Sequence, residues 1–411
     1  MSEINMNKEF FEDLIKGTNF VTADTGSLMN SRSKVPTPLY VINCVYGGGI
    51  PLGLIGEISG PPSSGKSTFG YQCMGIYQKK FEDGIAVVYD MESSSDNDRL
   101  KVLGVDTQKL LRLPATTMED AFASMFKMLN KLLELQKTNP NISTFQIYDT
   151  IAAGGTNKQK DAVSGGNSAF NAGSMMEAPR ILKQNLSNLF PYLEKLPVFI
   201  GLLNQVFTQM GVYTSSVKAG GGYGLQHNIH FHIVFGKNKD VFDGDFLIGT
   251  ESEVQLGKSK LSPKLIGIPC FIDARAGGKI DEVDSFVKYL AKSSVNIVRM
   301  GSWYNILDTI EKMKERYPSI KNSKGLDRYQ KQFRKNDFYA AVKEDRDLCN
   351  FLQVALIDFI DGIYPMQSEV NNEYKLQIMN ECSYFNNENE EKESIQKDIE
   401  NKESEDNSEN A

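Results

Sequence analysis

A glycine-bounded loop between an apolar segment and an amphipathic one constrains this chain more than any other feature. The loop runs Gly60, Pro61, Pro62, Ser63, Ser64, Gly65, Lys66, Ser67, Thr68 and follows the pattern GxxxxGK[ST]. Its glycines let backbone N–H groups turn inward around an anion, and the helix that follows adds its positive N-terminal end. Lys66 is placed to reach the β- and γ-phosphates of a nucleotide, and Ser67 to bind Mg²⁺. A chance glycine-rich turn is the alternative, and the flanking strand and helix argue against it.

Residues 36–284 alternate short apolar segments with amphipathic ones, which is typical of an α/β fold with a mostly parallel, twisted sheet. The expected strands are Gly56–Ser59, Ile85–Asp90, Phe145–Asp149, Pro197–Asn204 and His230–Phe235, with two more near Ser252–Leu256 and Pro269–Asp273. The expected helices are Lys66–Lys79, Met118–Gln136 and Ser174–Leu196, the last interrupted near Pro191. Two Gly-, Ser- and Asn-rich stretches, about 153–173 and 206–225, are long for connections in a compact domain and predict functional loops.

Three further regions flank this core. Residues 1–35 predict an N-terminal helical appendage for oligomerisation, whose amphipathic piece packs on its own core or on a neighbouring subunit. Residues 285–385 predict a small, helix-rich C-terminal domain. Residues 386–411 hold ten acids and three lysines, so the net charge of −7 lies in this tail, whose composition predicts disorder. Such a tail either aids solubility or competes with another polyanion for a basic groove.

Composition and spacing exclude several classes of protein. There is no run of about 18 apolar residues, which excludes a membrane-spanning helix. The first residues lack the apolar segment of a secretory signal. The five cysteines are scattered and form no CxxC pair, which argues against disulfides and structural zinc and favours the cytoplasm. His227, His230 and His232 lie close together, but no cysteine or carboxylate in their segment completes a metal site.

Polar side chains at the ends of three expected strands complete the nucleotide site. Asp149 closes an apolar strand in the Walker-B pattern and is expected to hold Mg²⁺ through water. Glu92, just past another strand, is the candidate base that positions the attacking water; the alternative is that Asp90 and Glu92 cap the next helix. Gln205 ends a third strand where the chain enters the second glycine-rich loop. An amide there can sense the γ-phosphate and change the order of that loop.

In their order along the chain, these segments resemble the RecA family of strand-exchange recombinases, and within it the UvsX-like recombinases of T4-like phages. The resemblance covers roughly residues 25–305. It rests on GPPSSGKS (60–67), YDMES (89–93), LGVD (103–106), IYDT (147–150), LLNQ (202–205), GGGYG (220–224), GKSK (257–260), FIDARAGGKID (271–281) and GSWY (301–304). The phosphate loop alone defines a large superfamily. The order, the spacing and the passage from LLNQ into a glycine-rich loop point to recombinases.

The resemblance implies an ATP- and Mg²⁺-dependent, DNA-stimulated ATPase that forms a helical filament on single-stranded DNA and pairs it with homologous duplex DNA. Glu92 matches the catalytic glutamate, and Gln205 matches the glutamine that links ATP to DNA binding. Lys258 and Lys260 match a lysine pair that reaches the γ-phosphate held by the neighbouring subunit. Without the resemblance, these two lysines are an ordinary solvated face. A loading or single-strand-binding protein is an expected partner.

The two glycine-rich loops match the DNA-binding loops of the family. Met210 falls where an apolar side chain wedges between bases, and Phe207 and Tyr213 are expected to stack on bases or to pack within the loop. The expected DNA contacts are Lys158, Lys160, Phe207, Met210, Tyr213, Lys218, Gly220, Gly221 and Gly222. The start of the second loop is uncharged where cations are common in the family, so part of the phosphate contact is expected from backbone N–H groups.

A second departure and two other functions complete these expectations. Arg99 stands where an adenine-stacking tyrosine is usual, and its guanidinium plane is the candidate stacking group. Basic residues between 311 and 346 are expected to be solvated helix faces, with contact to duplex DNA as the alternative.

A hexameric helicase shares the ATPase fold and also carries a late trans-acting cation. A filament-forming regulator or loader with a degenerate site is the non-enzymatic alternative, against which Lys66, Glu92 and Asp149 argue.

Overall fold

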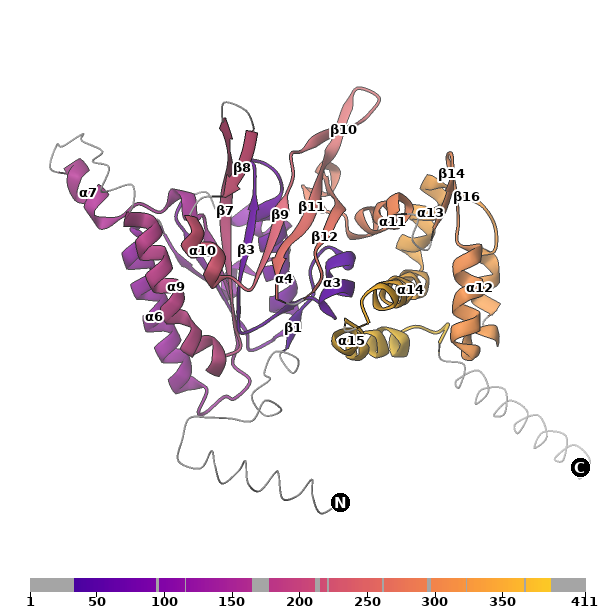
Figure 1. Cartoon of the computed structure of the whole chain (residues 1–411), viewed down its shortest axis with the longest axis horizontal. Coiled ribbons are helices and arrows are strands. Elements are labelled where there is room, and N and C mark those ends of the chain that lie inside the picture. Colours follow the sequence, from indigo (N-terminus) through magenta and orange to yellow (C-terminus); the bar gives the residue numbers. More distant parts are fainter. Residues whose placement is uncertain are drawn as a thin grey trace, which may run out of the picture.

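An eleven-stranded β-sheet forms the centre of the described part of the chain (Figure 1). The computed structural model describes residues 33–385 except 94–95, 115, 165–176, 211–214, 220–221, 261, 294–296, 323 and 366. The strand order is β13-β12-β11-β9-β3-β7-β6-β4-β5, with β10 beside β11 and β8 beside β7. The expected acidic tail and nearly all of the expected N-terminal appendage lie outside these residues.

Six adjacent strands of the described sheet run parallel. They are β9 (Phe231–Phe235), β3 (Leu54–Gly60), β7 (Val198–Met210), β6 (Thr144–Asp149), β4 (Ile85–Asp90) and β5 (Leu110–Leu113). The strands β3, β4 and β6 are buried along almost their whole length, as a parallel sheet covered on both faces requires. The prediction of an α/β fold with a mostly parallel sheet is confirmed by these strands.

Antiparallel strands extend the sheet beyond β9 and add a hairpin to β7. They are β8 (Ser215–Ala219), β10 (Lys239–Asp243), β11 (Phe246–Ser259), β12 (Leu265–Asp273) and β13 (Lys279–Ile280). The strands expected near 252–256 and 269–273 are therefore the inner parts of the longer β11 and β12. The sequence analysis did not predict β5, β8 or β10.

Helices cover both faces of the sheet (Figure 1). One buried cluster joins alternate strand residues to α6 (Met118–Leu135), α9 (Glu177–Lys195) and α10 (Gly222–Asn228). The other joins the remaining strand residues to α4 (Lys66–Lys80) and α3 (Tyr40–Tyr46). Ile147 and Tyr148 illustrate this alternation, because these neighbours on β6 belong to different clusters.

The expected interruption near Pro191 is wrong, because α9 runs through this proline. A proline lacks the N–H that would bond one turn back, so it normally kinks a helix. Here Pro191 lies on the exposed side, where water can bind the freed carbonyl. Leu186, Leu189 and Leu193 on the other side are buried in the core. Their packing holds the helix straight enough to continue for one more turn.

The C-terminal region is helix-rich, as predicted, and also contains a small sheet. Its helices are α11 (Glu282–Ser293), α12 (Leu307–Arg316), α13 (Lys335–Glu344), α14 (Arg346–Ile363) and α15 (Gln367–Glu381). Its strands β14 (Val298–Met300), β15 (Trp303–Asn305) and β16 (Phe333–Arg334) form an antiparallel sheet in the order β14-β15-β16. Among the described helices, none is long and apolar enough to span a membrane.

Helix α3 joins the C-terminal region to the sheet. The Gln367 side-chain amide donates to the Val45 carbonyl at 2.7 Å, and the rings of Tyr40 and Phe286 meet edge to face at 5.6 Å. The buried cluster that contains α3 continues without a break into α11, α13 and α14. The proposed domain boundary near residue 284 therefore falls inside α11, within a shared core.

Short elements complete the described chain. They are β1 (Lys34–Val35), β2 (Ile50–Pro51), α5 (Asn97–Val102), α7 (Asn157–Ser164) and the 3₁₀ turns Thr107–Lys109, Ile151–Ala153, Ala274–Ala276, Pro318–Asn322 and Lys324–Tyr329. The strand β1 pairs with β2, so the last residues of the expected N-terminal appendage belong to the folded core.

Candidate functional site

The glycine-bounded loop spans the gap between the end of β3 and the start of α4. Gly65 has φ of +97°, and a Cβ there would lie 2.6 Å from Ile272 Cδ1. At Gly60 a Cβ would lie 2.4 Å from Ser64 Oγ. Only glycine fits either position without a shift of its neighbours. The loop from Pro61 onward lines a cleft of about 1120 Å³ that opens between α4 and the β9–β12 side of the sheet.

Lys66 is the cation of this cleft. It is the first residue of α4, its side chain is largely buried, and Nζ donates to the Pro61 carbonyl at 3.3 Å. Burial lowers the pKa of Lys66, and the carboxylates of Asp149 and Glu92 oppose that shift by raising it. The ammonium group therefore lies in the field of both predicted carboxylates. This arrangement brings together Lys66, Asp149 and Glu92 from three separate elements, as predicted.

Asp149 ends β6 and presents one oxygen that has no hydrogen bond among the described residues. Its Oδ2 accepts a hydrogen bond of 2.7 Å from the Tyr71 hydroxyl, whereas its buried Oδ1 accepts none. Burial raises the pKa of Asp149 to about 6, and the bond from Tyr71 opposes this. A buried carboxylate oxygen without a donor fits a hydrated cation, and Ser67 lines the cleft beside Lys66. The described residues contain no cluster of three His, Cys, Asp or Glu, so phosphate oxygens and water would supply the other ligands.

Glu92 lies just beyond β4 and accepts two hydrogen bonds on the same oxygen. The Thr150 hydroxyl donates to Oε1 at 2.7 Å, and the Gln205 side-chain amide donates at 3.2 Å. Asp90 is instead buried against Arg112, whose Nε donates to Oδ2 at 3.0 Å. The alternative in which Asp90 and Glu92 cap the next helix is wrong.

The helix that follows has its own cap. Asp96 caps α5 by accepting from the Arg99 N–H at 3.1 Å. Glu92 is therefore free of a capping role and faces the same strand ends as Lys66 and Asp149.

Arg99 on α5 contacts the first turn of α4. Its guanidinium donates to the carbonyls of Gly277 and Gly278, the latter at 2.9 Å, and to the Thr68 hydroxyl at 3.2 Å. These bonds join α5, the start of α4 and the turn between β12 and β13. Arg99 therefore lies beside the first turn of α4, with its donors bound by the protein.

The second expected loop is in large part a β-hairpin. The strand β7 does not end at Asn204 but continues to Met210, and β8 returns beside it. In the backbone register, Phe207 pairs with Lys218 and Met210 with Ser215. Gln205 thus lies on the strand that forms one arm of this hairpin. The side chains of Phe207, Met210 and Lys218 are outside the described set, as are Tyr213, Gly220 and Gly221, while Gly222 begins α10.

The first expected loop is partly helical. A 3₁₀ turn over Ile151–Ala153 follows Asp149, and α7 covers Asn157–Ser164. Lys158 is exposed on α7 and forms an ion pair of 2.7 Å with Glu177, and Lys160 is exposed on the same helix. Both lysines therefore lie on a structured segment that begins at the nucleotide site.

Lys258 and Lys260 are exposed at the opposite end of the sheet from the loop of their own chain. The segment that carries them pairs with Phe231, and Phe231 pairs with Gly56. Since Gly56 precedes Gly60 by four positions, the lysines are displaced by about 13 Å along the strands from the loop. The two lysines therefore lie away from the loop of their own chain.

A buried carboxyl that the sequence analysis missed lies beneath the site. Glu57 on β3 is fully buried, and its Oε1 accepts a hydrogen bond of 2.7 Å from the Asn204 amide. The Nε2 of His232 lies 2.6 Å from Ser59 Oγ and 3.7 Å from Glu57 Oε2. His230 and His232 thus serve the sheet, since His230 Nδ1 likewise accepts from the Ile55 N–H at 3.1 Å, whereas His227 is exposed on α10.

Comparison with known proteins finds similarity to one family. The family model of the RecA N-terminal domain matches residues 27–270. Protein RecA of Ureaplasma parvum is 29% identical over 261 residues, which cover 63% of this chain and 72% of that protein. Protein RecA of Malacoplasma penetrans is 26% identical over 304 residues, 74% of this chain and 83% of that protein. Protein RecA of Clostridioides difficile is 27% identical over 265 residues, 64% and 70% respectively.

Proposed function

The chain belongs to the RecA family, and from this premise we propose that it is an ATP-dependent homologous recombinase. It forms a helical filament on single-stranded DNA, pairs that strand with homologous duplex DNA and exchanges strands, and DNA stimulates its ATP hydrolysis. The observation that carries the proposal is the hydrogen bond from Gln205 to Glu92. This bond joins the candidate base directly to the strand that becomes the candidate DNA-binding hairpin.

The cleft supports phosphoryl transfer to water. Backbone N–H groups of the loop and the start of α4 bind phosphate oxygens, and Lys66 neutralises charge on the β- and γ-phosphates. Ser67 and Asp149 would hold Mg²⁺, which would neutralise further phosphate charge when bound. Glu92 orients a water molecule and accepts its proton, while Thr150 fixes the direction of the carboxylate. Arg99 and the backbone of Gly277 and Gly278 form the side of the site against which the nucleotide base would lie.

The geometry of β7 supports a coupling between the nucleotide and DNA. Any movement of Gln205 toward a γ-phosphate changes its bond to Glu92 and shifts the first residues of the hairpin. The equilibrium between two arrangements of the hairpin then depends on the nucleotide, because ATP has a γ-phosphate that can accept a hydrogen bond from this amide and ADP does not. In the filament, Lys258 and Lys260 contact the γ-phosphate held by the neighbouring subunit. Hydrolysis removes that phosphate, and the interface between the two subunits then loosens.

The remaining roles are assigned on the resemblance of the sequence segments. Residues 36–284 form the ATPase core with DNA-binding loops at about 153–173 and 206–225, and residues 1–35 serve oligomerisation. Residues 285–385 form a C-terminal domain built on the shared core, and 386–411 form the acidic tail. Segments such as FIDARAGGKID and GSWY support assignment to the UvsX-like recombinases of T4-like phages. We place the protein in the cytoplasm of the cell in which it acts, with a loading or single-strand-binding protein as partner.

Lys66→Ala tests the ATPase and its dependence on the cleft. We expect wild type to hydrolyse ATP with Mg²⁺ faster when single-stranded DNA is added, and Lys66→Ala to lose at least about 100-fold in turnover, equivalent to about 2.7 kcal/mol. Lys79→Ala, an exposed lysine at the other end of α4, is the matched control and should keep full activity. Enzyme-coupled ATPase assays and electron microscopy with ATP-Mg²⁺ and DNA measure both turnover and assembly.

The outcome separates the three candidate functions. Open helical filaments that pair homologous duplex DNA support the recombinase. Closed rings that unwind duplex DNA would indicate a hexameric helicase instead. DNA-bound filaments without ATP turnover would indicate a regulator, and the proposed catalytic role of Glu92 would be wrong.

A further inference from the structure

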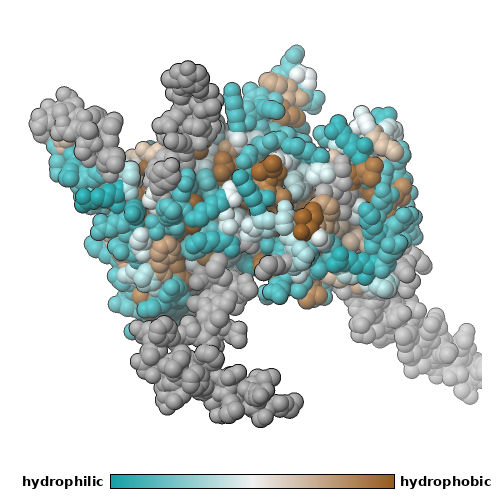
Figure 2. Space-filling model, viewed as in Figure 1, coloured by the Kyte–Doolittle hydropathy of each residue, from teal (hydrophilic) through white to brown (hydrophobic). Residues whose placement is uncertain are grey.

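A polar hollow of about 290 Å³ lies at the end of α4 that is remote from the glycine-bounded loop. We name it the lysine pocket, and its lining includes Lys34, Gly47, Gly48, Lys80, Phe81 and Glu373. These residues come from β1, the end of α3, the end of α4 and α15. Helix α15 packs on α3, and β1 packs on α4 (Figure 1). The residues that α15 exposes are mostly hydrophilic (Figure 2).

The lysine pocket is separate from the nucleotide cleft. Lys66 is the first residue of α4 and Lys80 is the last. At 1.5 Å per residue, these ends of the helix are about 21 Å apart. A ligand in the lysine pocket therefore does not contact the glycine-bounded loop.

Two lysines from different elements are held at this pocket. Lys34 Nζ donates to the Gly47 carbonyl at 2.8 Å, and Lys80 Nζ donates to the Lys34 carbonyl at 2.9 Å. The Lys80 ammonium also lies 5.9 Å from the centre of the Phe81 ring. An ammonium group has three N–H donors, and each of these uses one of them among the described residues. Two N–H groups on each lysine are therefore left for a ligand.

The lining of the pocket carries an excess of positive charge. It contains two lysines and one glutamate, Glu373 on α15, which together give a formal charge of +1. Burial lowers the pKa of both lysines, Glu373 opposes that shift in each, and Lys80 lowers the pKa of Lys34 further. One carboxylate is thus shared by two ammonium groups that repel each other. An anion between the two ammonium groups would offset this repulsion.

Two glycines form a wall of the pocket that has no side chains. Gly47 has φ of +63°, and a Cβ there would lie 2.9 Å from Lys34 Nζ. Gly48 has φ of +113°, and its Cβ would lie 3.1 Å from the ring of Tyr374. A side chain at either position would strain the backbone and press on a group that lines the pocket. The glycines therefore keep space open beside the lysines.

From these observations we propose that the lysine pocket binds a small tetrahedral oxyanion of the phosphate type. The two N–H groups that remain on each ammonium can donate to the oxygens of such an ion, and hydrogen bonds between charged groups are the strong ones. The pocket is far smaller than the cleft of about 1120 Å³, so its volume suits a free ion better than a nucleotide. The ion competes with Glu373 for the two lysines. Its binding requires neither ATP nor DNA and does not rest on the proposed function.

Isothermal titration calorimetry of the full chain with inorganic phosphate, in chloride buffers of constant ionic strength, tests the site. Lys66→Ala serves as the background, because it weakens phosphate binding at the glycine-bounded loop. On that background we expect saturable binding, and an affinity at least about 10-fold lower when Lys34→Gln or Lys80→Gln is added. Lys79→Gln is the matched control, because Lys79 precedes Lys80 on α4 but does not line the pocket. It should leave the affinity unchanged.

Glu373→Gln gives a test of the opposite sign. Loss of the carboxylate raises the formal charge of the lining from +1 to +2. The affinity for phosphate should therefore rise about 5-fold, because a competing and repelling charge is gone. A purely structural role of Glu373 predicts no such gain. This variant keeps the hydrogen bonds of both lysines, so it tests the proposal even if circular dichroism shows that a lysine variant is unfolded.

Three outcomes would overturn the proposal. One is the absence of saturable phosphate binding to the Lys66→Ala chain, and another is heat that chloride alone reproduces. The third is displacement of phosphate by short single-stranded DNA, which would assign the lysines to a nucleic-acid backbone. In the otherwise wild-type chain, substitutions at Lys34, Lys80 and Glu373 should leave nucleotide binding and ATP turnover unchanged. Failure of this site and failure of the ATPase proposal are thereby told apart.

Discussion

At the scale of single residues, Glu57 shows how the site depends on a group that touches no substrate. Burial raises the pKa of Glu57 from 4.5 to about 7. The unfolded chain loses this proton near pH 4.5, whereas the native protein keeps it to about pH 7. The native state therefore binds more protons across that window, and the contribution of Glu57 to stability falls as the pH rises through it. His232 acts in the opposite direction, because burial lowers its pKa from 6.5 to about 4 and stability then rises with pH.

Glu57→Gln isolates this contribution. The amide keeps an acceptor for Asn204 and has no charge to bury, so we expect equal stability of variant and wild type near pH 4.5. The variant should gain progressively up to about pH 7, reaching about 3 kcal/mol. Urea unfolding at several pH values measures the difference. Glu315→Gln, an exposed carboxylate on α12, should show no such pH-dependent gap, and a constant gap for Glu57→Gln would contradict the argument.

Gln205→Ala tests the coupling at the same scale. Removing the amide breaks the bond to Glu92 but leaves Lys66, Asp149 and Glu92 in place. We expect ATP binding and DNA-independent hydrolysis within about threefold of wild type, and at least about a 10-fold loss of stimulation by single-stranded DNA. Titrating DNA into an ATPase assay measures this. Equal loss of basal and stimulated turnover would mean that Gln205 supports the chemistry and not the coupling.

Patterns in the sequence predicted the charged groups of the site but not their supports. Lys66, Asp149 and Glu92 were found because a loop motif and the ends of apolar strands place them at one edge of a parallel sheet. Tyr71 and Thr150 were missed, because their roles depend on where α4 and the turn after β6 pack. Glu57 was missed for the same reason: an acid inside an apolar strand carries no signal that Asn204 faces it.

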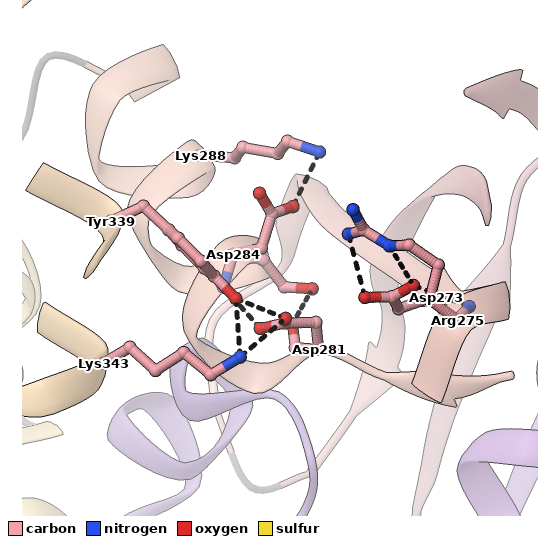
Figure 3. Close-up of polar contacts among 8 residues, drawn as sticks. Asp273, Arg275, Asp281, Asp284, Lys288, Tyr339 and Lys343 are labelled. Carbon is pink, nitrogen blue, oxygen red and sulfur yellow. Dashed lines mark hydrogen bonds and ion pairs between the residues drawn. The ribbon is translucent and has the colours of Figure 1, made fainter. Parts of the chain in front are cut away.

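At the scale of elements, a polar cluster fixes α13 of the C-terminal region to the start of α11 (Figure 3). The Tyr339 hydroxyl donates to Asp281 Oδ2 at 2.5 Å, and Lys343 lies 3.8 Å from the same oxygen. Asp281 also caps α11, because its Oδ1 accepts from the Asp284 N–H at 2.9 Å. Asp281 follows the turn of Gly277 and Gly278, whose carbonyls bind Arg99, and Arg99 also donates to Thr68 of the cleft. Helix α13 is thus linked to the cleft through this turn and Arg99.

Tyr339→Phe removes the hydroxyl of this link and leaves its ring. We expect a loss of about 1–2 kcal/mol in the free energy of unfolding, since a hydrogen bond to a charged group is lost. We also expect weaker nucleotide binding, because the Gly277–Gly278 turn loses support. Urea denaturation and fluorescent-nucleotide titration measure the two effects. Tyr364→Phe is the matched control, a partly exposed tyrosine near the end of α14 whose hydroxyl has no hydrogen bond in the described residues; a similar loss there would remove the specific role of Asp281.

Elements with strong periodicity were predicted well, and those set by distant contacts were not. Strands β3, β4, β6 and β9 and helices α4 and α6 match their patterns closely. Helix α3 was missed, since YVINCVY is rich in residues that favour strands. It is helical because α14 and α15 cover it and because Asn43 exchanges hydrogen bonds with Thr37 at 2.8–2.9 Å. The hairpin of β7 and β8 was read as a loop because of the serines of β8 and the glycines at 220–222, although Val206, Phe207 and Thr208 favour a strand.

At the scale of the whole molecule, one buried core serves both the sheet and the C-terminal region. The cluster runs from β9 through α3 into α14 without a polar layer between them. Removal of the C-terminal helices would expose this side of α3, so the core of residues 36–284 is not expected to be stable by itself. Cooperative unfolding of both parts follows from the shared core.

The only tryptophan of the chain makes this cooperation measurable. Trp303 lies in the C-terminal sheet, away from the nucleotide cleft, so its fluorescence reports unfolding of that region. A ligand that binds only to the native cleft stabilises every region that unfolds together with the cleft. At a free ligand concentration 100 times the dissociation constant, the stabilisation is about 2.7 kcal/mol. We therefore expect ATP-Mg²⁺ to raise the Trp303 melting temperature by a few degrees and to keep it coincident with far-UV circular dichroism. Lys66→Ala should abolish the shift. If ATP-Mg²⁺ left the Trp303 melting temperature of wild type unchanged, the C-terminal region would unfold independently despite the continuous core.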